Sequence, residues 1–153
     1  MPLSSAKLFD GLDNPPRETV EEAAEDFAEA YRAWFAEASG LLSTTPLNGA
    51  KASMKSALLA WDPNVSTGAN TLQSGITAFW GVVSASAASL FSTATAATPP
   101  GGLGSIGSTL QGLGLNNDNV TNEQAMQAFA NTIHTASLGG LWVLPAGATA
   151  PIA

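Results

Sequence analysis

The sequence predicts an all-α protein of about four helices packed around a central helix that carries no charge. Residues 68–97 contain no ionisable side chain, and their apolar side chains recur at helical spacing: Leu72, Ile76, Phe79, Val83, Ala87 and Leu90. Three further segments, two before this one and one after it, show the apolar periodicity of amphipathic helices. We expect strands to hold less than about a tenth of the residues, which is below the usual share.

The central helix is expected to run without interruption over 68–97, where Pro99 and Pro100 end it. A helix that presents apolar or small side chains on every side is normally buried. Gly75 and Gly81 lie within it, at points where the helix can bend or let a neighbouring helix approach closely. These features predict that the other helices surround this one.

The first long helix is expected over 19–38. Thr19 and Glu22 have the T-x-x-E spacing of a capping box, and Gly40 follows as the expected left-handed residue after the helix. Its acidic residues gather on one face, which we interpret as the solvent-exposed face. The alternative interpretation of this face is a docking surface for a basic partner.

The second helix is expected over 46–61 and the last over 121–136. Pro46 suits the first turn of the second helix, and Thr121 with Gln124 repeats the capping-box spacing. The side chains expected in the shared core come from all four helices: Trp34, Trp61, Phe79, Val83, Leu90, Phe129 and Ile133.

Two lysines form the first pair of interface candidates. Lys51 and Lys55 lie one turn apart on the second helix, so they present their charges on one side. They have two possible sets of partners, the acidic face of the first helix in the same chain or that of a neighbouring subunit. Glu25 and Glu29 are the expected partners by position.

Residues 1–137 are expected to form one helical domain, which includes an ordered Gly-rich loop at 101–119 with a helical turn near 105–111. Residues 138–153 carry no charge, and their prolines prevent a helix. We therefore expect an extended apolar C-terminal arm, with a short strand at 141–144. The arm either packs on its own central helix or, as we favour, contacts a neighbouring chain. Its candidate contact residues are Leu141, Trp142, Val143, Leu144 and Ile152.

Only 11% of the 153 residues are charged, against about a quarter in an average domain. The net charge is −7, and all five basic residues lie at or before Lys55. Because clustered Lys and Arg are needed to neutralise phosphates, we expect no direct nucleic-acid binding. A surface with so few charges indicates that neighbouring subunits cover part of it, so we expect a homo-oligomer.

No set of residues forms a recognisable catalytic site, so we expect no enzymatic activity, cofactor or metal. Residues 102–107 match G-x-G-x-x-G, but a dinucleotide site requires a preceding buried strand in a βαβ unit, and here two prolines follow a predicted helix. His134 is the only histidine, and no acidic partner that would orient it is recognisable. The chain has no cysteine, which excludes disulfides and thiolate metal sites.

Segment 76–97 is uncharged and long enough to span a bilayer. However, many of its residues are Ser, Thr or Gly, and neither Lys nor Arg flanks it to set a topology. We do not expect membrane insertion, and a small membrane-active or lysis-linked, holin-like protein is the alternative function.

Four stretches follow one another along the chain: FAEAYRAWF in the early helix, AFWG in the uncharged middle, a TPPGG break, and QAFANTIHTAS before a Gly-rich apolar end. This order resembles, in outline and over most of the chain, a group of small structural proteins of tailed bacteriophages. The resemblance implies a non-enzymatic virion protein that is assembled in the host cytoplasm and contacts other virion proteins. It implies a ring or array in the neck or tail, or a place on the capsid.

Overall fold

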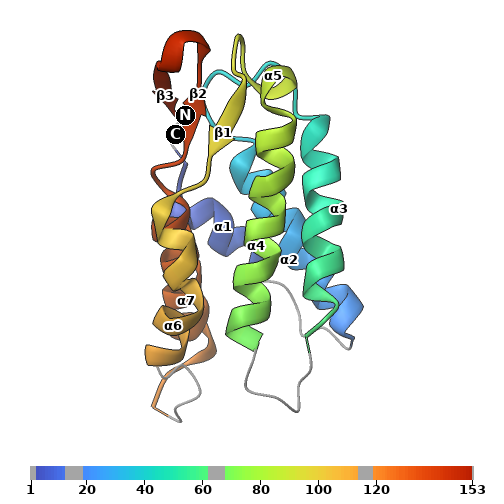
Figure 1. The fold of residues 1–153 in the computed structure, drawn as a ribbon. Helices are drawn as coiled ribbons and strands as arrows, with labels where there is room; N and C mark the ends of the chain where they lie inside the picture. The colour runs from blue at the N-terminus through green and yellow to red at the C-terminus, as the bar shows by residue number, and fades with distance from the viewer. Residues whose placement is uncertain (1–2, 13–18, 62–67, 114–118, 153) are drawn as a thin grey trace.

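A computed structural model describes residues 3–12, 19–61, 68–113 and 119–152. These residues form a mostly helical body with a small sheet at one end (Figure 1). The predicted fold class is confirmed in part: the described residues are mostly helical, but three short strands pair, so the fold is not purely all-α. The strands are β1 (Ala96–Thr98), β2 (Leu141–Val143) and β3 (Thr149–Pro151), antiparallel in the order β1-β2-β3.

The first helices are α1 (Ser5–Leu12), α2 (Val20–Phe35) and α3 (Pro46–Leu58). Thr19 caps α2 through the predicted capping box: its hydroxyl accepts the backbone N–H of Glu22, and the Glu22 carboxylate accepts the backbone N–H of Thr19. Gly40 has the predicted positive φ, 79°. Both α2 and α3 end three residues before their predicted ends at 38 and 61.

The predicted continuous helix over 68–97 is wrong in its second half. The chain forms α4 (Gly68–Ala85), leaves helical geometry at Ser86, adds the short α5 (Ala87–Leu90) and then becomes extended. Thr93 has a φ of 64°, a left-handed conformation that β-branched residues rarely adopt. Because the chain turns there, β1 returns alongside α4, and the N–H of Ala97 donates to Ser84 Oγ at 3.2 Å.

α4 occupies the middle of the body, side by side with α3 and α6 (Figure 1). At Gly75 the close approach of α3 is direct, since an added Cβ would lie 2.8 Å from Leu58 Cδ2. Gly81 differs, because it is exposed and no atom lies within 4 Å of the position a Cβ would take. Of these two glycines, Gly75 is therefore the one that serves helix packing within the chain.

The C-terminal helical layer contains the short 3-10 helix η1 (Gly101–Ser105), α6 (Ile106–Gly112) and α7 (Asn122–Ser137). The helical turn predicted near 105–111 is confirmed and is longer than expected. The hydroxyl of Thr121 and the side chain of Gln124 form the second predicted capping box at the start of α7.

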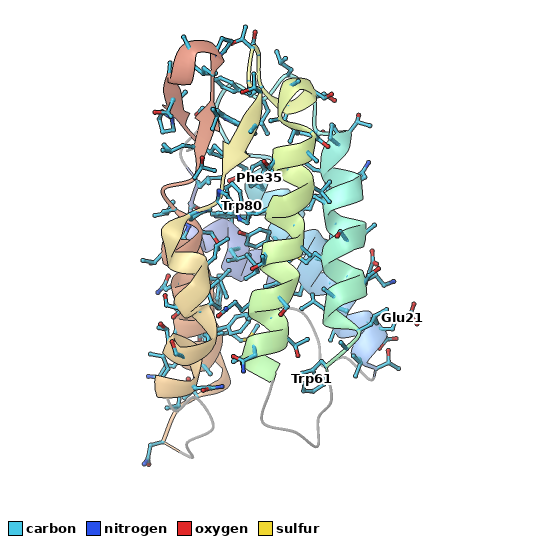
Figure 2. The ribbon with its side chains drawn as sticks, in the orientation of Figure 1. Glu21, Phe35, Trp61 and Trp80 are labelled. Carbon is cyan, nitrogen blue, oxygen red and sulfur yellow. The ribbon has the colours of Figure 1, made fainter. Side chains whose placement is uncertain are left out.

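An aromatic cluster joins α2 to α4 in the core. The rings of Tyr31 and Phe79 meet edge to face with centroids 4.9 Å apart, and those of Phe35 and Trp80 at 5.3 Å. Figure 2 shows Phe35 and Trp80 close together in the body, below the sheet. The predicted core residues that are buried are Trp34, Phe79, Val83, Leu90 and Ile133, whereas Phe129 is half-buried.

Trp61 was predicted in the core, and this is wrong: its side chain is 40% exposed at the far end of the body (Figure 2). The prediction extended the helical spacing of Met54 and Leu58 to Trp61. Because α3 ends at Leu58, that spacing no longer places Trp61 on the buried face. The indole lies instead beside Gly68, where an added Cβ would be 2.5 Å from Trp61 Nε1.

Candidate interaction surfaces

The four charged interface candidates lie together between α2 and α3 of one chain. Lys51 forms an ion pair with Glu25, and its Nζ lies 3.0 Å from Glu29 Oε2. Lys55 Nζ lies 3.0 Å from Glu25 Oε2 and 3.4 Å from Glu21 Oε1. The two lysines therefore alternate with three glutamates spaced one turn apart on α2. The structure therefore shows the first of the two alternatives, in which the lysines pair with the acidic face of α2 in the same chain.

These ion pairs shift the pKa values of their carboxylates. Hydrogen bonds from Arg32, and then from Lys51, lower the pKa of Glu29 to about 2. The hydrogen bond from Lys51 is the largest cause of the lowered pKa of Glu25. Because both pKa values are lowered by folding, the stabilisation is present above the ordinary carboxyl pKa and is lost as the pH falls. Because water screens pairs at the surface, each of these ion pairs contributes little to stability.

Two of the tail candidates, Trp142 and Ile152, are buried in their own chain. The indole of Trp142 stacks on Phe91 with centroids 5.3 Å apart and an interplanar angle of 13°. Just before it, Gly140 lets Trp80 approach, since an added Cβ would lie 2.5 Å from Trp80 Cη2. The expectation that Trp142 fills a pocket on a neighbouring chain is therefore wrong, and the tail packs on its own body.

The tail is a hairpin rather than an extended arm. β2 and β3 are joined by the short turn η2 (Pro145–Gly147), in which Ala146 and Gly147 have positive φ values. Alternate residues of a strand face opposite sides of a sheet. Leu141 and Val143 therefore face away from Trp142, and both are half-buried on the outer face of the sheet. Leu144, also half-buried, packs against the core.

The free edge of the sheet is β3, and it is a poor template for another strand. Ile152 N–H donates to the Gly140 carbonyl, and Leu144 N–H donates to the Ala148 carbonyl. In an antiparallel ladder this pattern turns the backbone groups of Thr149 and Pro151 outward. Because proline has no N–H, the short edge offers a single donor, which disfavours strand addition by a partner.

The ionisable side chains are unevenly divided between two parts of the sequence. We call the described residues of 3–12 and 19–61 the charged half, and those of 68–113 and 119–152 the uncharged half. In the uncharged half, Glu123 and His134 are the ionisable side chains. The exposed positions of α4 and α6 carry uncharged side chains, among them Asn70, Ser74, Thr77, Gly81, Ala85, Ser108 and Thr109. The exposed positions of α4, α6 and the sheet thus carry no charge.

Buried polar bonds that sequence reasoning missed join α2, α4 and α7. The hydroxyl of Tyr31 donates to Ser137 Oγ at 2.7 Å and accepts the indole N–H of Trp80 at 3.0 Å. A separate bond runs from Trp34 Nε1 to His134 Nδ1 at 3.2 Å. Burial raises the pKa of Tyr31, so its hydroxyl stays neutral. One residue in the sequence could have indicated these bonds. Ser137 is a polar residue one turn after Ile133 on the apolar stripe of α7.

The G-x-G-x-x-G stretch has a packing role. An added Cβ at Gly102 would lie 2.9 Å from the carbonyl oxygen of Ala136 on α7. Gly107 approaches α4, and its N–H donates to Gln73 Oε1 at 3.0 Å. The strand before this stretch, β1, belongs to an antiparallel sheet, so the context of a dinucleotide site is missing. In the described part of the chain, no group of three or more His, Cys, Asp or Glu is placed to hold a metal ion.

The chain was compared with family models, with curated proteins and with solved structures, and none of the three comparisons found a match. Among the helices of the described ranges, none combines the length and the apolar character that crossing a bilayer requires.

Proposed function

We propose that this protein is a non-enzymatic structural subunit of a tailed-phage virion, assembled in the host cytoplasm. It forms a ring or array in the neck or tail, or on the capsid, through contacts with its own copies and with other virion proteins. The order of sequence stretches that resembles small phage structural proteins supports the class of function. The uncharged half of the surface is the single observation that supports assembly.

The distribution of charge favours contact between copies through the uncharged half. With a net charge of −7, two copies that met through α2 would bring acidic side chains together. Removing such charges from water is costly, and the centres of protein interfaces are depleted of charged residues. An approach through α4, α6 and the sheet avoids this cost.

The charged half already uses its charges within the chain. The ammonium groups of Lys51 and Lys55 are each paired with two glutamates of α2. If these lysines bound another subunit, the ion pairs within the chain would be broken. The new ion pairs would be of similar strength, so the exchange would gain little. The charged half is therefore expected to face solvent in the assembly.

Two matched variants test this proposal. Gly81→Glu places one negative charge in the uncharged half, where the added side chain meets no atom of its own chain within 4 Å at Cβ. Ser56→Glu places the same charge at an exposed position of α3 in the charged half. We expect the native protein and Ser56→Glu to sediment as an oligomer and to co-purify with phage particles. Gly81→Glu should be helical, monomeric and absent from particles.

A native protein that is monomeric and absent from particles would contradict the proposal, as would equal assembly of both variants. The holin-like alternative rests on the uncharged segment 76–97. It requires that the protein be extracted with detergent, whereas a virion subunit is released without it.

A further inference from the structure

The ring of His134 contacts a buried tryptophan at the end of the bundle. His134 lies in the last turn of α7 and is half-buried, while Trp34 on α2 is fully buried. Trp34 Nε1 lies 3.2 Å from His134 Nδ1, and the two rings meet edge to face with centroids 5.8 Å apart. This contact does not involve the surface proposed for assembly.

The chemistry of the two rings fixes the protonation state that the contact needs. An indole N–H can only donate a hydrogen bond, so Nδ1 must carry a lone pair and the ring proton must sit on Nε2. An imidazolium carries hydrogens on both nitrogens. If His134 were protonated, its Nδ1–H would face the indole N–H of Trp34, and both groups are donors. The buried N–H of Trp34 would then lack an acceptor, which is costly.

We propose that His134 is a pH-sensitive clasp that holds the end of α7 on α2 when neutral and releases it when protonated. The second bond in this region, from Tyr31 to Ser137, does not titrate in the same range because burial raises the pKa of Tyr31. Beyond Ser137 the chain passes directly into the hairpin of β2 and β3. Release of the clasp therefore loosens the attachment of the hairpin as well as that of α7.

The ionisable groups of the elements near α7 do not form an ion pair that would stabilise a protonated His134. α1 contributes Lys7, whose ammonium nitrogen lies 3.7 Å from a carboxylate oxygen of Glu37. α2 contributes its acidic residues and Arg32, which pairs with Glu29. The described parts of η1 and α6 contribute none. Among the described side chains, no carboxylate forms an ion pair with His134.

Two effects then compete at the ring. The carbonyl groups at the C-terminal end of α7 favour an imidazolium, whereas burial lowers the pKa of His134 below its ordinary value of 6.5. Burial determines the direction of the pKa shift. Because the pKa is lower in the folded chain, the stabilisation is fully present above pH 6.5 and is lost as the pH falls below it.

The clasp is tested by unfolding the native protein and His134→Gln in urea at pH 7.5 and pH 5.5. Glutamine offers an acceptor oxygen to Trp34 but does not titrate. His134 is the only histidine, and the carboxylates of Glu25 and Glu29, whose pKa values are lowered by their ion pairs, remain ionised in this range. We expect the urea midpoint of the native protein to be lower at pH 5.5 than at pH 7.5. The urea midpoint of His134→Gln should be the same at both pH values. An equal fall in both proteins, or no fall in the native protein, would overturn the proposal.

Nuclear magnetic resonance of the native protein gives an independent answer if His134→Gln does not fold. The indole resonance of Trp34, assigned by its loss in Trp34→Phe, should shift with the same midpoint as the His134 ring, while the other three indoles serve as controls. Amide exchange in 141–152 should also accelerate, after correction for intrinsic rates, as the ring titrates. A Trp34 resonance that does not follow the titration would contradict the clasp.

Discussion

The charged and uncharged halves of this protein reach stability by different means. In the charged half, α2 and α3 are regular amphipathic helices joined by ion pairs between glutamates and two lysines. In the uncharged half, glycines and alanines allow close approach of elements, and Trp80 and Trp142 fill the space between α4 and the sheet. The comparison teaches that a region with few charged residues can still be well packed. In this chain the ion pairs stabilise one half, and close apolar packing stabilises the other.

Deletion of 138–153 is the change with the largest expected effect. It removes the buried side chains of Trp142 and Ile152, and it uncovers Phe91, on which Trp142 stacks, and Trp80, which approaches Gly140. Loss of one buried tryptophan costs about 3–5 kcal/mol, so the deletion should cost more than about 5 kcal/mol, comparable to the whole stability of a small domain. Urea unfolding followed by circular dichroism should show no cooperative transition. A truncated chain that unfolds like the full chain would show that the hairpin is not part of the core.

Phe79→Ala tests the contact between the two halves. Phe79 on α4 is fully buried against Tyr31 and Phe35 of α2. The substitution should lower the free energy of unfolding by about 3–5 kcal/mol, from lost burial and from the cavity left behind. The control is Leu42→Ala, because Leu42 is 63% exposed and its loss should change stability by less than about 0.5 kcal/mol. A cost below about 1 kcal/mol for Phe79→Ala would mean that this face of α4 is not in the core.

Gly140→Ala tests close packing within the uncharged half. The added methyl group would meet Trp80 at 2.5 Å, so either the indole or the hairpin must move. We expect a loss of about 1–3 kcal/mol, as for other overpacked sites. Gly81→Ala is the matched control, since it adds a methyl group in open space within a helix and should stabilise by up to about 1 kcal/mol. Equal effects of the two substitutions in thermal unfolding would refute the packing contact.

Replacement of both lysines, Lys51→Met and Lys55→Met, has the smallest expected effect. It removes the ion pairs with Glu21, Glu25 and Glu29, which are weak because water screens pairs at the surface. The native protein should lose stability with added salt, whereas the double variant should respond less because screening acts on the removed pairs. Urea midpoints at low and high salt measure this difference. Identical salt responses would show that the ion pairs do not stabilise the fold.

The sequence predicted the charged half well because its signals are local. The capping box of Thr19 depends on residues three positions apart, and the structure confirms it. The pairing of Lys51 and Lys55 with α2 was one of two alternatives, because sequence spacing shows which side of a helix a charge occupies but not which chain faces it.

The uncharged half was predicted less well because its structure depends on contacts distant in the sequence. No proline, glycine or charge marks the end of α4 at Ala85, and β1 forms only because β2 pairs with it about 45 residues later. The tail was predicted to be apolar, but it was predicted as an extended arm rather than as a hairpin. Its burial depends on the space that Gly140 opens beside Trp80, and sequence spacing carries no sign of that space.

The mass of the native protein in solution, measured by sedimentation equilibrium at low and high salt, tests the central claim most directly. If copies meet through the uncharged half, the protein is an oligomer whose mass does not fall as salt rises, because no ion pairs cross the contact. A mass equal to that of one chain at every concentration would contradict the claim. An oligomer that dissociates in high salt would contradict it too, since the charged half would then form the contact.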